Sequence, residues 1–194
     1  MFLLTKDFWN ILDTGKKGRG VFAQRPIKQG SIIGDYLGKL VRLKDVDFDK
    51  EKKNMYLMYY NDNAAIYPDL KNPGVYLLNH SCSPNCWIYK YKGHSLFFAL
   101  KNINVGDELT ISYLLPPRNI CKNCTHYCFC GSKYCTKTMH LTEEKYKFWQ
   151  EFQKKQDNKI KPEGTVNKKY LVPLSKYPKV IPKSYIRKII KLGI

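Results

Sequence analysis

The sequence predicts a mostly β fold of several small sheets, followed by one helix and a basic extension. Between residues 18 and 113, short runs rich in β-branched and aromatic residues alternate with turn residues, which is typical of many short strands. Residues 141–157 have apolar side chains at helical spacing. From residue 164 to the end, the chain contains eight Lys or Arg, several prolines and no acid. Such a segment packs as an extended strap or stays mobile.

The strands are expected in chain order from residue 18 onward. Residues 18–23 and 31–41 read as strands around a turn at 25–30, which indicates a hairpin-rich beginning. Further strand signals lie at 56–60, 64–67, 75–78, 87–91 and 96–100, with turns at 61–63 and 92–93. Asn79 and His80 then emerge at the end of the apolar run 75–78.

Residues 43–56 are polar and form an inserted helix or loop. Asp45, Asp47, Asp49 and Glu51 alternate with other residues, so an extended insert would place four carboxylates on one edge. That edge would suit a basic peptide. A solvated charged connection is the favoured alternative, because charge runs are usually solvated.

The C-terminal part is expected to contain two helices. Thr142 is the N-cap of the 141–157 helix, and Tyr146, Trp149 and Phe152 follow at spacings of three. Residues 184–192 favour a short basic helix.

Composition restricts the class of protein. The 194 residues suffice for one core, and 43% hydrophobic content indicates a folded chain. No run approaches the roughly 18 apolar residues that span a bilayer. We therefore expect an intracellular protein, cytoplasmic or nuclear, without membrane contact and monomeric. Seven cysteines in a reducing compartment are better interpreted as metal ligands and buried thiols than as disulfides.

The formal net charge of +18 favours acidic partners such as nucleic acid. A lysine-rich chain from a biased genome explains the charge equally well. No helix-turn-helix or RNA-binding signature accompanies it.

Three motifs occur in a defined order. Asn-His-Ser-Cys-Ser-Pro-Asn-Cys at 79–86 is followed by Gly-Asp-Glu-Leu-Thr-Ile-Ser-Tyr at 106–113 and by Cys-Phe-Cys-Gly-Ser-Lys-Tyr-Cys at 128–135. In this order they resemble the SET-domain protein lysine methyltransferases with a cysteine-rich post-SET segment. The resemblance implies a β-clip fold with a pseudoknot, in which 106–113 passes through the loop formed by 79–86. It divides the chain into a SET domain at 1–115, a post-SET zinc segment at 116–140 and an extension at 141–194.

The resemblance also implies a site for S-adenosylmethionine. The Gly18-Arg19-Gly20 triplet leaves the backbone open to a ligand, although glycine pairs alone are most often turns. His80 taken singly would be a buried, hydrogen-bonded histidine. The residues expected to bind the cofactor are Lys17, Gly18, Arg19, Gly20, Tyr36, Tyr76, Asn79, His80, Tyr113 and Phe129.

The implied reaction is methyl transfer from a sulfonium to a neutral lysine amine. An unperturbed lysine is neutral roughly once in 2,500 at pH 7, and an apolar channel would lower its pKa. Tyr113 matches the family's catalytic tyrosine, and Tyr36 its partner at the mouth of the channel. Tyr76 and Leu77 replace the usual arginine and phenylalanine. At the two positions before Tyr113, this chain has Ile111 where many members have an aromatic residue, and Ser112 where an aspartate is frequent. The number of methyl groups transferred is therefore left open.

The cysteines are expected to bind zinc. Cys128, Cys130 and Cys135 have post-SET spacing, and the resemblance supplies Cys82 as the fourth thiolate of one structural site. Buried free thiols are the alternative. A zinc ion at the four cysteines would place Phe129 over the active site. A second zinc would be held by Cys121, Cys124 and His126 together with Cys86 or His140.

Three hypotheses follow from these observations. The first is a methyltransferase that acts on lysine in a basic protein, such as a histone, a ribosomal protein or a DNA-packaging protein. The second is a binding module that kept the fold without turnover. The third is a zinc-dependent nucleic-acid-binding protein.

Overall fold

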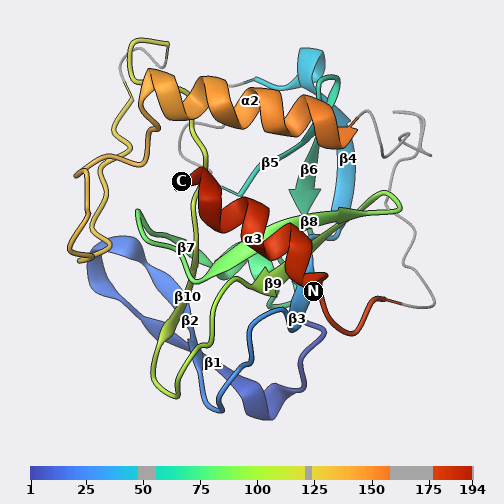
Figure 1. The fold of residues 1–194 in the computed structure, drawn as a ribbon, viewed down its shortest axis with the longest axis vertical. Coiled ribbons are helices and arrows are strands. Elements are labelled where there is room, and N and C mark those ends of the chain that lie inside the picture. The colour runs from blue at the N-terminus through green and yellow to red at the C-terminus, as the bar shows by residue number, and fades with distance from the viewer. Residues whose placement is uncertain (48–55, 121–123, 158–176, 194) are drawn as a thin grey trace.

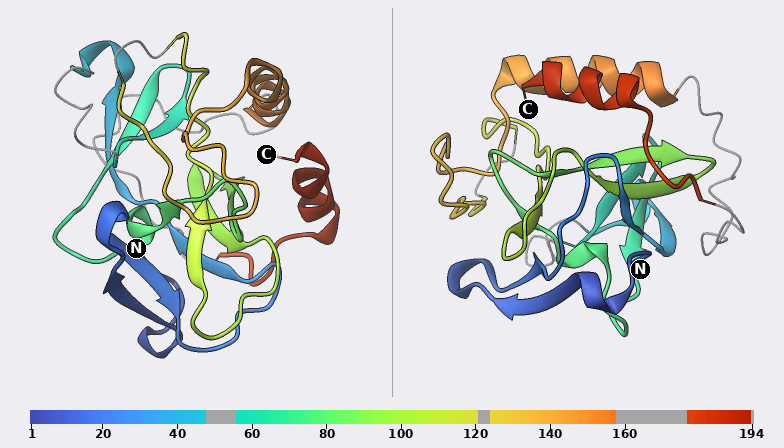
Figure 2. Two further views of the ribbon diagram at one scale, coloured as in Figure 1. Left: turned by 90° about the vertical axis from the view of Figure 1, so that its left-hand side faces the viewer. Right: turned by 60° about the horizontal axis from the view of Figure 1, so that its bottom comes forward.

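A computed structural model describes residues 1–47, 56–120, 124–157 and 177–193 of the chain. In these residues, short strands form three small sheets, and two helices near the C-terminus lie together on one side (Figures 1 and 2). The predicted fold class, mostly β with several small sheets and a helical C-terminal part, is confirmed.

The strands are two to six residues long. They are β1 Trp9–Asp13, β2 Arg19–Ala23, β3 Ile32–Asp35, β4 Gly38–Arg42, β5 Met58–Asn61, β6 Ala64–Pro68, β7 Asn79–His80, β8 Cys86–Tyr91, β9 His94–Ala99 and β10 Glu108–Ile111. Short 3-10 helices connect them at η1 Lys6–Phe8, η2 Gly15–Lys17, η3 Leu43–Asp45 and η4 Val75–Leu77. The strand regions predicted at 56–60, 64–67, 87–91 and 96–100 correspond to β5, β6, β8 and β9.

The first sheet has the strand order β1-β2-β10-β7 and contains two of the sequence motifs. β10 is antiparallel to β2 on one edge and parallel to β7 on the other, with Thr110 opposite Asn79 and Ile111 opposite His80. Asn85, in the loop after β7, forms two side-chain hydrogen bonds with the backbone of β10. It accepts the N–H of Thr110 and donates to the carbonyl of Glu108, both at 2.8 Å. Residues 106–113 therefore lie against the 79–86 segment, the contact expected for the predicted pseudoknot.

The second sheet, β3-β9-β8, separates two parts of the core. All six residues of β9 are buried, because both faces of this sheet are covered. Phe97 packs into the main core with Val21 and Ile66, whereas Phe98 belongs to a second cluster on the opposite face. The third sheet, β4-β6-β5, extends the main core through Leu40 and Ile66.

The second cluster is covered by α2 Glu143–Asp157 and α3 Lys183–Leu192, which lie side by side in Figure 2. Trp149 of α2 meets Trp87 of β8 edge-on, with ring centroids 5.8 Å apart. Both predicted helices are confirmed, and so is the cap of the first, since Thr142 Oγ1 accepts the N–H of Lys145 at 3.3 Å. No helix in the described ranges combines the length and the apolar content needed to cross a bilayer.

One local prediction is wrong, and one strand was missed. The run 75–78 is not a strand, because Val75–Leu77 forms η4 and Asn79–His80 are themselves the strand β7. An apolar run of four residues carries no period that separates a short helix from a strand. The strand β1 was not predicted. In the acidic insert, Leu43–Asp45 forms η3, while Asp49 and Glu51 lie outside the described residues.

The helical layer yields a stability prediction. Ile189 is 3% exposed in the second cluster, whereas its neighbour Ile190 is 54% exposed on the outer side of α3. Ile189→Ala should lower the free energy of unfolding by about 2–4 kcal/mol, since it removes buried methylenes and leaves a cavity. Ile190→Ala should change it by less than about 0.5 kcal/mol. Urea unfolding of both variants measures this, and equal effects would contradict the described packing of α3.

Candidate functional site

The paired strands β7 and β10 bring the predicted site residues His80 and Tyr113 together. The backbone N–H of Tyr113 donates to His80 Nδ1 at 3.2 Å, and the two rings meet edge-on with centroids 5.4 Å apart. The Tyr113 hydroxyl donates to Leu78 O at 3.3 Å. Asn79, the residue between Leu78 and His80, points its amide to the other side, toward Glu108.

Tyr113 and Tyr36 belong to a group of four tyrosines with Tyr56 and Tyr76. The Tyr36 hydroxyl donates to the backbone carbonyl of Tyr56, and the rings of Tyr56 and Tyr76 meet edge-on at 5.3 Å. Burial raises the pKa of Tyr36 well above its ordinary value, and Tyr113, Tyr56 and Tyr76 raise it further. Burial also raises the pKa of Tyr113. These two hydroxyls are therefore neutral at pH 7 and act as hydrogen-bond donors, not as bases.

Tyr56 was missed by the sequence analysis. The chain contains 15 tyrosines, and none of the three motifs includes residue 56. Only its contacts with Tyr36 and Tyr76 distinguish it.

The glycine triplet lies against β10 and β7. Gly18 has φ +73°, a left-handed conformation that L side chains rarely adopt. A Cβ on Gly20 would lie 2.6 Å from Glu108 Oε1 and 2.9 Å from Asn79 Nδ2. Gly20 therefore leaves space in which the Asn79 amide meets the Glu108 carboxylate.

Glu108 connects two predicted cofactor residues. Its carboxylate forms an ion pair with the Lys17 ammonium, and it accepts a hydrogen bond from Asn79 Nδ2 at 2.8 Å. The same amide lies 3.3 Å from the carbonyl of Arg19. Glu108 was not predicted as a site residue, although it lies in the 106–113 motif. Its role depends on the pairing of β10 with β2 and β7, which no local pattern reveals.

Phe129 and Tyr76 lie on the periphery of this arrangement. Phe129 is 49% exposed, and its ring centroid lies 5.2 Å from the Lys16 ammonium nitrogen. The cysteine-rich segment therefore reaches the residues just before the glycine triplet. The position of Phe129 over the active site stays a prediction. The Tyr76 hydroxyl donates to Asn72 O at 3.1 Å.

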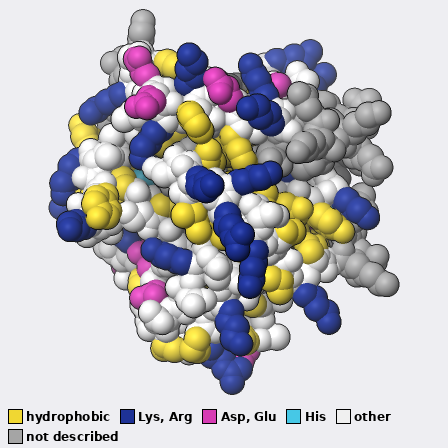
Figure 3. All heavy atoms as spheres, viewed as in Figure 1, with side chains coloured by type: hydrophobic (Ala, Val, Ile, Leu, Met, Phe, Trp, Pro, Cys, Tyr) yellow, Lys and Arg dark blue, Asp and Glu magenta, His cyan; other side chains and the backbone are white. Residues whose placement is uncertain are grey.

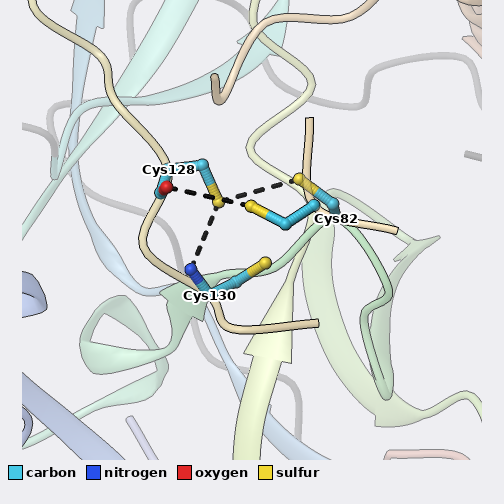
Figure 4. A group of neighbouring side chains, drawn as sticks. Cys82, Cys128 and Cys130 are labelled. Carbon is cyan, nitrogen blue, oxygen red and sulfur yellow. Dashed lines mark hydrogen bonds between the residues drawn. The ribbon is translucent and has the colours of Figure 1, made fainter. Parts of the chain in front are cut away.

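The four predicted zinc ligands form one cluster. The sulfur atoms of Cys82, Cys128, Cys130 and Cys135 lie within 4.8 Å of one another, and Figure 4 labels Cys82, Cys128 and Cys130. The Cys82 and Cys128 sulfurs are 3.7 Å apart. Zinc–sulfur bonds of about 2.3 Å predict a separation of about 3.8 Å in a tetrahedral site. The donor set and its spacing therefore fit a structural zinc.

His80 connects this cluster to Tyr113. Burial lowers the pKa of His80 to about 4, so the imidazole is neutral at pH 7. Because Nδ1 accepts the Tyr113 N–H, the proton is on Nε2, which lies 3.6 Å from Cys82 Sγ. One imidazole thus contacts the Cys82 sulfur on one side and the backbone of Tyr113 on the other.

Cys124, His126 and His140 form a second group, with ligand atoms within 4.8 Å of one another. The alternative that joins Cys86 to this group is wrong, because Cys86 is fully buried in the main core with its sulfur 3.3 Å from Asn85 Oδ1. Burial raises the pKa of the Cys86 thiol. Cys121 lies outside the described residues.

A family model described as "SET domain" matches residues 18–114, half of the chain. The chain belongs to the SET-domain family. The match ends one residue after Tyr113 and includes the paired motifs on β7 and β10.

Several curated proteins are similar to this SET-domain chain. Histone-lysine N-methyltransferase trithorax of Drosophila virilis is 29% identical over 144 residues, which cover 70% of this chain and 4% of that protein. Variant-silencing SET domain-containing protein of Plasmodium falciparum is 35% identical over 117 residues, 53% of this chain and 5% of that protein. Histone-lysine N-methyltransferase, H3 lysine-36 specific, of Homo sapiens is 28% identical over 176 residues, which cover 81% of this chain and 6% of that protein. The chain thus spans a small part of each of these relatives.

A solved structure has the same fold. The crystal structure of KRYPTONITE in complex with mCHG DNA and SAH aligns with a TM-score of 0.56 and 26% identity. The alignment covers 68% of this chain and 28% of that one.

The Asn79–Glu108 contact of this SET domain is testable by replacing the neutral amide with a carboxylate. Asn79→Asp should lower the free energy of unfolding by about 1–3 kcal/mol, because it places a carboxylate oxygen against Glu108 Oε1 in a buried position. A double-mutant cycle with Glu108→Gln should give a coupling energy above about 0.5 kcal/mol.

The matched control is an exposed pair of the same kind. Asn119 Nδ2 donates to Glu143 Oε1 at the same 2.8 Å, but in solvent. Asn119→Asp should change stability by less than about 0.5 kcal/mol. Denaturant unfolding without ligand measures the four proteins of the cycle and the Asn119→Asp control, and an additive cycle at Asn79 and Glu108 would contradict the described contact.

Proposed function

We propose that this chain transfers the methyl group of S-adenosylmethionine to the ε-amine of a lysine in a protein substrate. The observation that carries the proposal is the His80–Tyr113 contact at the parallel pair of β7 and β10, beside the tyrosine group. Membership of the SET-domain family and similarity to proteins named histone-lysine N-methyltransferases support it.

The tyrosine group suits this reaction because it orients groups without ionising. S-adenosylmethionine supplies an activated methyl group on a sulfonium. The neutral lysine amine forms a bond to the methyl carbon as the carbon–sulfur bond breaks, and the methylated amine then releases a proton to solvent. Tyr113 and Tyr36 are the proposed catalytic residues. Their hydroxyls stay protonated and hold the amine and the methyl group in line.

The same geometry suggests how the cofactor is bound. Gly18, Arg19 and Gly20 would present backbone to the ligand, and Lys17 and Asn79 are held in place by Glu108. The remaining proposed contacts come from Tyr36, Tyr76, His80, Tyr113 and Phe129. The similarity to a structure solved with SAH supports a cofactor of this class.

A structural zinc is proposed at Cys82, Cys128, Cys130 and Cys135. This ion would attach the post-SET segment to the loop after β7, and with it Phe129, which lies beside Lys16. The His80 bridge joins Cys82 to the Tyr113 backbone, so loss of the metal should disturb the position of the tyrosine.

The proposed substrate is a basic protein bound to nucleic acid, such as a histone. A chain of net charge +18 repels a free basic peptide at long range and is attracted to a polyanionic assembly. Figure 3 shows Lys and Arg side chains spread over the face that carries α3. Exposed basic residues of this helix are Lys183, Arg187, Lys188 and Lys191.

Replacement of one hydroxyl tests the reaction. Tyr113→Phe should reduce transfer of labelled methyl groups to core histones or reconstituted nucleosomes by about 100-fold or more, because an orienting donor is lost. Scintillation counting and mass spectrometry of the labelled lysines measure the transfer. S-adenosylmethionine binding, measured by calorimetry, shows whether the site is still folded.

Tyr91→Phe is the matched control, since Tyr91 lies at the distant β8–β9 turn. It should leave the rate unchanged. Full activity of Tyr113→Phe would remove Tyr113 from its role. Cofactor binding by the unmodified chain without transfer to any basic protein would favour a binding module, and salt-sensitive DNA binding alone would favour a nucleic-acid-binding protein.

Loss of one thiolate tests the zinc proposal. Cys130→Ser should release about one zinc per chain and reduce methyl transfer by about 10- to 100-fold. Lys133→Ser, an exposed substitution in the same loop, should retain zinc and activity. Metal analysis and the labelled-methyl assay measure both. Unchanged zinc content in Cys130→Ser would refute this ligand set.

A further inference from the structure

The Cys124, His126 and His140 group lies at the two ends of the cysteine-rich segment. The backbone brings these ends together: Met139 N–H donates to His126 O at 3.0 Å, and Tyr127 and Thr138 form an antiparallel bridge. Cys124 and His140 are buried, and His126 is half-buried. Three side chains with metal-binding atoms therefore meet in a largely buried place and form a group separate from the four cysteines.

The orientation of His140 is the one expected of a metal ligand. Its Nδ1 lies 2.5 Å from the carbonyl of Pro116, which only accepts, so Nδ1 carries the proton. The lone pair is then on Nε2, which faces Cys124 Sγ at 2.9 Å. Metal-bound histidines usually donate their other N–H to a carbonyl or carboxylate in this way.

A hydrogen bond from the Cys124 thiol to His140 would explain the short distance between these two residues. It would not explain why His126 lies beside them. The His126 and His140 rings lie with centroids 5.3 Å apart and tilted by 50°, and the ligand atoms of all three residues converge within 4.8 Å. In a tetrahedral zinc site, sulfur and nitrogen ligands are about 3.6 Å apart, so binding requires Cys124 and His140 to separate by only about 0.7 Å.

We propose that Cys124, His126 and His140 bind a second zinc ion. Cysteine sulfur and histidine nitrogen are both ligands of zinc in proteins, and three such ligands leave the fourth tetrahedral position to water or a further donor. Leu115 pairs with His140, and Leu141 N–H donates to Leu115 O at 3.0 Å. The ion would therefore fasten the base of the cysteine-rich segment beside the chain that leaves Tyr113. This inference is independent of methyl transfer.

Metal analysis of the full chain tests the proposal. The unmodified protein, purified with zinc, should contain two zinc ions per chain. Its zinc K-edge absorption should show imidazole scattering, which the four-cysteine cluster cannot produce. His126→Asn should lose about one zinc, together with the imidazole signal. Cys130→Ser should also lose about one zinc but keep that signal.

Thr125→Asn, an exposed neighbouring substitution, is the control and should retain two zinc ions. One zinc per unmodified chain with only sulfur scattering would overturn the proposal, and so would two zinc ions with unchanged imidazole scattering in His126→Asn. The measurement on the unmodified chain decides the question even if a variant fails to fold. Circular dichroism reports the folding of each variant.

Discussion

The parallel pairing of β7 with β10 is the constraint on which the site depends. The pairing is only two residues long and forms few backbone hydrogen bonds. Asn85 stabilises it with side-chain hydrogen bonds to the backbone of Glu108 and Thr110. With β10 held between β2 and the loop after β7, the Asn79–Glu108 and His80–Tyr113 contacts acquire a fixed geometry. One buried amide thus supports both halves of the candidate site.

The same constraint relates the four-cysteine cluster to the tyrosines. Cys82 lies two residues after His80. The His80 imidazole accepts the Tyr113 N–H at Nδ1, and its Nε2 lies 3.6 Å from the sulfur of Cys82, a proposed zinc ligand. A metal bound at this point is coupled to the tyrosine through one imidazole and two hydrogen bonds. The second cysteine and histidine group joins the two ends of the cysteine-rich segment, and its His140 pairs with Leu115. The segment therefore contacts the loop after β7 through Cys82 and the chain after β10 through Leu115.

Much of the fold was predictable because its patterns are local. The strands β5, β6, β8 and β9 and both helices follow from alternation, turn residues and helical spacing. β7 and η4 were assigned wrongly because a two-residue strand has no period, and its existence depends on a partner distant in sequence. β1 was missed for a related reason, since this strand is stabilised by its pairing with β2.

The sequence by itself determined the family, the order of the motifs and the four-cysteine set, because these are carried by residue type and spacing. Only the tertiary structure decided that Glu108 joins Lys17 to Asn79, that Tyr56 belongs with Tyr36, and that His140, not Cys86, accompanies Cys124. The physical reason is that each of these contacts joins segments brought together by sheet pairing. Cys86 faces the core because of its place on β8, a direction that its motif does not reveal.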